Sequence, residues 1–517
     1  MVDSQKSYKK RTPLDGASFL FISSVLVGFI FVLTCIRAPL WYDESNYLSL
    51  IAAIRATGYP VWFWQPGEPQ LFFSHPPAVL YVLSILPEWF TRNIVCLRLF
   101  NIAVFGLGPF FALMIQSRRG GISLFTIYAT ALFTACTGVF LMELIQVRFD
   151  MPLAALSCFI ILIYANAIEP SNDAQKNKGP RASFRSPFLL LSLSILIFLT
   201  KFQAICLTGA LALDVVAEYL LSKKRIVVGP FLTHFAGALL GIVIFLWWLS
   251  SSKYAPGSAE LYATVHWNIA FRTFPGNDFV KQAILFLSIA QRILALTVVP
   301  LTVFLTAWAL GTIDWNERLF RLFLEVTIVV ILFNLAIYRS PGAAGSNMLM
   351  AVVPLGYILG RSFESLLRLR RGPVALWSLV FMIGLHGILN FPPVTRALQP
   401  DFNQMGADRI EPLLGKEDLL LLGDENQSRA IPFMLHRNDR YGFLFSMIPA
   451  DALGLLAREG PGKVGALVLS EDNLAQLQSE KWSSVSEIID RRFYRADYIG
   501  TNYRLVILLP RKSGEQK

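Results

Sequence analysis

The stretch Trp41–Tyr47, WYDESNY, stands shortly after the first long apolar run of the chain, near 17–36. That run is about twenty residues long, which is enough to cross a bilayer as a helix, and the basic residues 9–11 precede it. Basic residues favour the cytoplasmic side of a membrane, so the first helix should deliver Asp43 and Glu44 to the extracytoplasmic face. Because no small-residue cleavage site follows, the run is predicted to be a retained anchor.

Composition places the chain among multispanning membrane proteins. Of its 517 residues, 54% are hydrophobic and 16% are charged, and the mean hydropathy is +0.52; soluble domains carry about 25% charged residues. The net charge of +11 falls mainly in short clusters between apolar runs, as the positive-inside rule predicts for cytoplasmic loops. We therefore expect no nucleic-acid partner. The five cysteines show no CxxC spacing, which favours buried thiols over disulfides or a zinc site.

Ten further apolar runs continue the crossing pattern. They lie at about 94–115, 122–141, 152–168, 188–200, 202–222, 228–249, 283–310, 320–338, 347–362 and 374–391. With eleven crossings, every dense cluster of lysine and arginine falls on one side, as expected of the cytoplasm. The segments 43–57 and 76–90 are too short to cross, and we expect them to be helices within a first external loop over 37–93.

Pro392-Pro393 marks a change in composition after the last apolar run. Beyond it, short apolar runs alternate with helical stretches near 450–458 and 471–480, which favours a small α/β domain. The apolar runs are Leu419–Leu422, Ala466–Leu469 and Leu505–Leu509. The sequence thus predicts a transmembrane domain over 1–391 and an extracytoplasmic α/β domain over 392–517, with no internal repeat.

Several polar residues gather on the extracytoplasmic side of this map. His75 precedes two prolines that hold it in an extended segment, and it could donate to a phosphate or, with a carboxylate such as Glu44, ligate a divalent ion. Arg148 could hold a phosphate. Lys201 lies between two apolar runs, where a charge is costly unless it is paired or interfacial, so snorkelling and phosphate binding both remain open. Arg339, at a later outer turn, is a further candidate.

The acids at this rim also have two interpretations each. Asp43 could act as a base, or it could simply cap the helix predicted over 43–57. Asp150 could take part in chemistry or cap the span that begins near 152, and the two roles are compatible. The chain has no Gly-x-Gly-x-x-Gly loop, no Walker A sequence and no HExxH. We therefore expect no nucleotide cofactor.

These motifs resemble those of the GT-C membrane glycosyltransferases, and more narrowly the protein mannosyltransferase and aminoarabinose (lipid A) transferase group, which uses polyprenyl-phosphate sugars. Tyr42-Asp43-Glu44 followed by Tyr47 resembles the family's Asp-Glu element, and Ser74–Pro77 its Pro-Pro element in the His-Pro-Pro form. Arg148–Pro152 is similar to its second acidic loop, and Leu199–Lys201 to its Leu-Thr-Lys turn. Order, spacing and a C-terminal external domain match over essentially the whole chain.

The resemblance implies roles for these residues. Asp43 would be the base or would orient the acceptor, Glu44 would belong to the same catalytic element, and Asp150 would be a second catalytic acid. Tyr47, His75 and Lys201 would belong to the donor-phosphate site, which Arg148 and Arg339 could extend, and the family implies inversion at the anomeric carbon. Two departures are Asn46, where bacterial relatives often carry arginine, and Ser74-His75, where they often carry Glu-Lys.

The leading hypothesis is a transferase of the bacterial inner membrane that moves a monosaccharide from a polyprenyl-phosphate donor to lipid A or lipopolysaccharide, an envelope glycan or a protein. A ligase or polymerase that uses a polyprenyl-diphosphate glycan is an alternative within the same chemistry. A secondary transporter is an alternative of another class, but it would place its acids within the spans and show inverted repeats. The sequence leaves the sugar, the acceptor and any divalent metal open.

Overall fold

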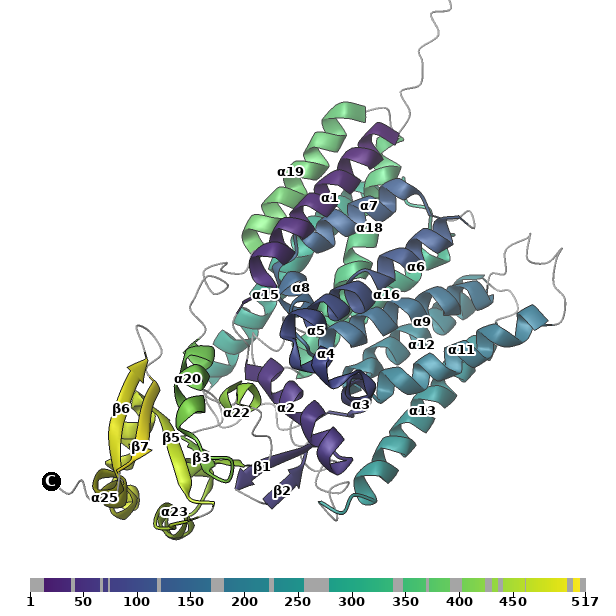
Figure 1. Cartoon of the computed structure of the whole chain (residues 1–517). Coiled ribbons are helices and arrows are strands. Elements are labelled where there is room, and N and C mark those ends of the chain that lie inside the picture. The colour runs from purple at the N-terminus through teal and green to yellow at the C-terminus, as the bar shows by residue number, and fades with distance from the viewer. Residues whose placement is uncertain are drawn as a thin grey trace, which may run out of the picture.

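The computed structural model of the chain is a tilted bundle of helices with a small sheet domain at one end (Figure 1). The structure describes residues 14–38, 42–65, 68–72, 75–118, 122–168, 181–222, 227–254, 279–337, 347–368, 372–390, 402–423, 430–435, 440–460, 462–499 and 505–511. The turn around the predicted boundary at 392 and the turn that carries Arg339 lie outside these ranges.

Helical segments occupy all eleven predicted span positions within the described ranges. They are α1 (Leu14–Cys35), α5 to α6 (Ile94–Ser117), α7 with α8 (Leu124–Ala135 and Gly138–Leu144), α9 (Asp150–Ile168), α11 (Arg181–Phe198), α12 (Ile205–Ser222), α13 (Gly229–Ser250), α15 (Phe279–Ala309), α16 (Arg318–Ile337), α18 (Leu349–Leu367) and α19 (Gly372–Asn390). Six helical segments in the described part are long and apolar enough to cross a membrane, and the α7–α8 pair makes a seventh if it is one span. The predicted helical multispanning fold is confirmed.

Two of these spans are not the straight helices that the sequence predicts. The second consists of α5 (Ile94–Asn101), a π-helical turn η1 (Ile102–Gly106) and α6 (Gly108–Ser117). Gly106 in η1 lies against α8, since a Cβ on it would lie 2.2 Å from Cδ1 of Leu144. The third span bends by 79° between α7 and α8. This bend carries the end of α8 into the loop that precedes Asp150.

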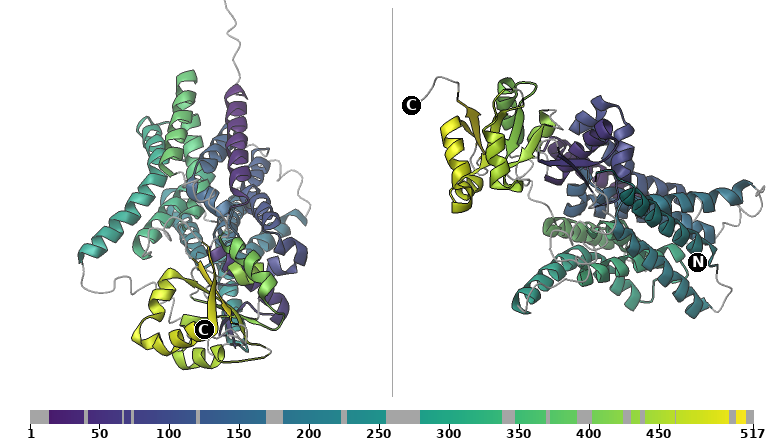
Figure 2. Two further views of the ribbon diagram at one scale, coloured as in Figure 1. Left: turned by 60° about the vertical axis from the view of Figure 1, so that its left-hand side comes forward. Right: turned by 90° about the horizontal axis from the view of Figure 1, so that it is seen from below.

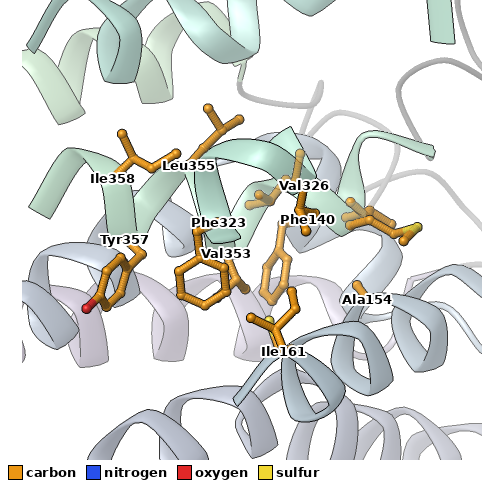
Figure 3. Close-up of a cluster of buried hydrophobic side chains, with 14 of the residues drawn as sticks. Phe140, Ala154, Ile161, Phe323, Val326, Val353, Leu355, Tyr357 and Ile358 are labelled. Carbon is orange, nitrogen blue, oxygen red and sulfur yellow. The ribbon is translucent and has the colours of Figure 1, made fainter. Parts of the chain in front are cut away.

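The centre of the bundle is a buried apolar core around α18. Side chains of α18 pack against α8, α9 and α16, and Figure 3 shows Phe140, Ile161, Phe323 and Val353 from these four helices gathered in one cluster. Gly360 lets α18 approach α7 closely, because a Cβ there would lie 2.8 Å from the carbonyl oxygen of Thr126. Small residues of this kind allow close helix packing in membranes. The core fixes the helix ends from which the site is built.

The first loop contains a helix, a hairpin and two short helices. Helix α2 (Tyr42–Thr57) confirms the helix predicted over 43–57, and β1 (Val61–Gln65) pairs antiparallel with β2 (Glu68–Leu71). The single helix expected over 76–90 is wrong, because the structure has α3 (Ala78–Ile85) and α4 (Glu88–Arg92) instead. Pro87 explains the break, since a residue before proline avoids the helical region, and Leu86 is extended.

The C-terminal sheet has the strand order β4-β3-β5-β7-β6. Its strands are β3 (Leu419–Leu422), β4 (Tyr441–Phe443), β5 (Val464–Ser470), β6 (Phe493–Ile499) and β7 (Leu505–Pro510). Strand β3 pairs parallel with β4 and β5, whereas β7 pairs antiparallel with β5 and β6. The helices around it include α20 (Phe402–Ile410), α22 (Ala430–Met434), α23 (Pro449–Leu456), α24 (Glu471–Leu477) and α25 (Ser483–Arg492). The predicted α/β composition is confirmed.

This C-terminal domain packs on the first loop, as the second view in Figure 2 shows. Ala53 of α2 and Val61 of β1 belong to the same buried cluster as Ile410, Leu420 and Phe443 of the domain. The first loop is therefore enclosed between the helical bundle on one side and the sheet on the other.

Candidate active site

A buried ion pair joins the start of α9 to the turn after α11. Nζ of Lys201 lies 2.5 Å from Oδ1 of Asp150, and the two side chains are 8% and 4% exposed. Lys201 has an extended backbone between α11 and the short helix η2 (Phe202–Ala204). It therefore lies in the turn between two helices, at one end of the bundle. Its Nζ also lies 3.5 Å from Oδ1 of Asn347, just before α18.

Arg148 extends this pair into a row of alternating charges. Its Nη1 lies 2.5 Å from Oε1 of Glu143, and its Nη2 lies 3.8 Å from Oδ2 of Asp150. The order is thus Glu143, Arg148, Asp150, Lys201, and we refer to these four residues as the charge cluster. Buried ions are tolerated when they are paired in this way. Arg148 is the most accessible of the four, with 20% of its side chain exposed.

His75 reaches the charge cluster from the first loop. The backbone N–H of Ala78, three residues later, donates to the carbonyl oxygen of Leu199 at 3.1 Å, which fixes the proline segment against the turn that carries Lys201. The His75 ring packs edge-on against Phe149, with centroids 5.4 Å apart, and it is close enough to Asp150 to interact electrostatically. The sequence-predicted convergence of His75 with the acidic loop and the lysine turn is present.

Tyr47 approaches the same aromatic ring from α2. Its ring centroid lies 4.6 Å from that of Phe149 and 6.3 Å from that of Phe72, and the residue is buried. Tyr47 and His75 thus both contact Phe149, which stands between Arg148 and Asp150 in the chain. Edge-to-face contacts of this kind fix ring orientation.

Glu44 has a different environment from the one predicted. Its two carboxylate oxygens accept hydrogen bonds from Nε and Nη2 of Arg98 at 3.0 and 2.6 Å, and the backbone N–H of Val147 donates to it at 3.3 Å. Glu44 and Arg98 are both 0% exposed. The predicted roles of Glu44 as a catalytic group or a metal ligand do not fit this buried pair, whereas a structural role does.

The roles predicted for two other site residues, Asp43 and Arg339, remain predictions. Asp43 lies in the first turn of α2, but its side chain is outside the described part of the structure, so the base and the helix cap both remain open. Arg339 lies outside the described residues altogether.

Sequence reasoning missed three polar residues of this region. Glu143 belongs to the charge cluster, Asn347 contacts Lys201 within it, and Asn101 binds the backbone of the acidic loop. Arg98 lies inside the second span, where a charge is costly unless it is paired, and it is completely buried against Glu44. A polar residue inside an apolar run was the available signal for Asn101 as well.

A second set of buried polar residues lies at the opposite end of the bundle. Arg318 at the start of α16 pairs with Asp214 of α12 at 2.5 Å, and the Tyr164 hydroxyl at the end of α9 donates to the same carboxylate at 3.1 Å. Since α9 begins at Asp150, about 20 Å of helix separates this set from the charge cluster. The two sets are independent.

Comparison with known proteins identifies the fold. No family model matches the sequence, and no curated protein matches it. The crystal structure of ArnT from Cupriavidus metallidurans bound to undecaprenyl phosphate is 14% identical, with a TM-score of 0.62 over 96% of this chain and 98% of that chain. The chain has the GT-C fold. Archaeal oligosaccharyltransferase AglB from Archaeoglobus fulgidus, in complex with an inhibitory peptide and a dolichol-phosphate, shares this GT-C fold at 13% identity and a TM-score of 0.57, over 96% and 74% of the two chains.

One GT-C neighbour contains a metal, which bears on the metal hypothesis for His75 and Glu44. The Archaeoglobus fulgidus oligosaccharyltransferase in complex with Zn and sulfate has 14% identity and a TM-score of 0.58, over 93% of this chain and 72% of that chain. Within the described part of the present chain, no three His, Cys, Asp or Glu side chains come together as a metal site. Of the two predicted ligands, Glu44 is committed to Arg98.

Proposed function

We propose that this protein is an integral-membrane glycosyltransferase. It would move a monosaccharide from a polyprenyl-phosphate donor to lipid A or lipopolysaccharide, an envelope glycan or a protein, at the extracytoplasmic face of the bacterial inner membrane. The observation that carries this proposal is the meeting of Lys201, Arg148 and His75 at one end of the bundle. Two proteins of the same fold hold a lipid phosphate, undecaprenyl phosphate in one and dolichol-phosphate in the other, which supports the donor class.

The cations of the charge cluster suit the leaving group of such a reaction. When the bond between the anomeric carbon and the phosphate oxygen breaks, negative charge develops on the phosphate, and fixed cations in a dry site stabilise it. Arg148 offers a partly exposed guanidinium for this purpose. One guanidinium group can donate two parallel hydrogen bonds to the oxygens of one phosphate. Asp150 holds Arg148 and Lys201 near each other, so we assign it the role of orienting these cations.

The acceptor side of the reaction needs a base. The acceptor hydroxyl attacks the anomeric carbon, the carbon–oxygen bond to phosphate breaks, and the hydroxyl proton passes to a carboxylate. We assign this role to Asp43, since its neighbour Glu44 is buried against Arg98 and anchors the start of α2. The single displacement would invert the anomeric configuration.

The test is sugar transfer by purified protein in lipid nanodiscs, followed by mass spectrometry of lipid and protein acceptors. We expect transfer from polyprenyl-phosphate monosaccharides by the wild type and no transfer by Asp43→Asn. Asp314→Asn is the matched control, because Asp314 is exposed between α15 and α16 at the opposite end. Full activity of Asp43→Asn would remove the base assignment.

Testing several donors in the same assay separates the alternative functions. Transfer only from polyprenyl-diphosphate glycans would favour the ligase or polymerase. Uptake of a solute into liposomes without any transfer would favour a transporter and would overturn the proposal.

A further inference from the structure

Helix α5 connects the two acidic segments of the site through two buried polar residues. Arg98 and Asn101 are three residues apart, so they lie on the same face of the helix. They are 0% and 4% exposed. Neither belongs to the charge cluster or to the motifs used above.

Asn101 holds the loop that carries Arg148. Its Nδ2 donates to the carbonyl oxygens of Leu144 and Gln146 at 2.7 and 2.8 Å and lies 3.3 Å from that of Glu143. Glu143 and Leu144 are the last residues of α8 and Gln146 lies just beyond it, where helical hydrogen bonds end and the free carbonyls need partners. One amide therefore fixes the backbone directly before Arg148.

Arg98 holds the segment that carries Asp43. Its Nη1 donates to the carbonyl oxygens of Ile36 and Ala38 after α1, at 2.8 and 2.7 Å. The rest of its guanidinium pairs with Glu44 at the start of α2. Arg98 thus fixes the chain on both sides of residues 39–41.

Glu44 closes the network between the two segments, because the N–H of Val147 donates to its Oε1. The π-helical turn that begins directly after Asn101 adds a packing contact at the same place, where Gly106 meets Leu144. Such π-helical turns are frequent at functional sites. The start of α2 and the loop 143–148 are consequently bound to one helix and to each other.

We propose that Asn101 and Arg98 are positioning residues that set the place of Arg148 relative to Asp43. The inference rests on the proposed function, in which Arg148 contacts the donor phosphate and Asp43 faces the acceptor. Displacement of reacting groups by about 1 Å can cost about a hundredfold in rate. Loss of the Asn101 amide should therefore weaken donor binding and slow transfer although it touches neither substrate.

The experiment measures binding of undecaprenyl phosphate to the full-length protein in nanodiscs by native mass spectrometry, together with the donor KM. For Asn101→Ala we expect Kd and KM to rise by up to about tenfold, because binding must then order the Arg148 loop, a cost that the one or two lost hydrogen bonds had met. A merely smaller folded fraction would leave KM unchanged. In a background that already carries Arg148→Ala, Asn101→Ala should have little further effect on Kd and KM, because Asn101 acts through Arg148 and coupled residues are not additive.

Asn166→Ala is the matched control. Asn166 also joins two spans, through amide hydrogen bonds of 2.9 Å with Gln116 of α6, but at the far end of α9. We expect its Kd and KM to equal those of the wild type. Should Asn101→Ala fail to fold, Asn101→Ser keeps one donor and should show a smaller shift of the same sign.

Hydrogen exchange gives a readout that does not depend on any activity. Backbone amides of residues 143–149 should exchange faster in Asn101→Ala than in the wild type. Amides near Asn166, at the far end of α9, should exchange at the same rate in both proteins. If the wild type binds no undecaprenyl phosphate, the proposed function fails, and exchange still tests the contact. If the wild type binds it and Asn101→Ala binds it equally well, or Asn166→Ala weakens binding as much, the positioning role is refuted.

Discussion

Nζ of Lys201 lies 2.5 Å from Oδ1 of Asp150, although 51 residues separate the two in the chain. Both side chains are more than nine-tenths buried, so neither ion has bulk water as an alternative partner. The pair should therefore affect both the stability of the protein and the proposed sugar transfer. Suitable variants can separate these two effects.

We expect Asp150→Asn to lower the free energy of unfolding by about 3–5 kcal/mol, because it leaves Lys201 buried without its counter-ion. The double variant with Lys201→Met should recover much of this loss, yet it should show no sugar transfer. Thermal unfolding in detergent and the transfer assay measure the two quantities. An active double variant would exclude Lys201 from the donor site.

Asp43→Asn and Glu44→Gln should fail in opposite ways, although the residues are neighbours. Glu44→Gln breaks a fully buried pair with Arg98 and should destabilise the protein by about 3–5 kcal/mol. Asp43→Asn should abolish transfer with little change in the unfolding temperature. A stable but inactive Glu44→Gln would restore the catalytic role predicted from the sequence.

His75→Phe should keep the ring contact with Phe149 but remove the nitrogen atoms that can bind a phosphate. We expect a rise in the donor KM with little change in stability. His234→Phe is the contrasting control, since His234 is buried between Ser194 and Thr208 at 2.8 and 2.9 Å. That variant should lose stability and keep its donor KM. Equal KM values in the wild type and His75→Phe would remove His75 from the donor site.

Ala53→Glu should separate the C-terminal domain from α2. Ala53 is 3% exposed in the cluster that joins the two, and a buried charge without a partner is strongly unfavourable. We expect faster proteolysis near residue 392 and reduced transfer. Ala56→Glu places the same charge on the exposed face of the same helix and should change neither. Unchanged proteolysis of Ala53→Glu would show that this contact does not hold the domain.

Local sequence properties predicted most of the architecture. Long apolar runs predicted the span positions, since the membrane demands about twenty apolar residues wherever a helix crosses. The breaks at Pro87, between α5 and α6, and between α7 and α8 were not predicted. At the last two, Gly106 lies against Leu144 of another span, and no local pattern in the sequence records a contact between segments so far apart.

Local sequence properties also predicted part of the site. Charged residues at the rim were visible as exceptions to an apolar background, and His75, Arg148, Asp150 and Lys201 do meet. The partner of Glu44 could not be inferred, because Arg98 is 54 residues away and several other cations were available.

The pairing of Asp150 with Lys201 has a consequence for biosynthesis. The ribosome makes Asp150 first, and this acid has only the more distant Arg148, 3.8 Å away, as a cation until α11 and its following turn have been translated. Helices α9 and α11 pack against each other, so joint insertion as a hairpin would neutralise both charges before the later spans exist. We therefore expect the acidic loop and the lysine turn to assemble early in the maturation of the nascent chain.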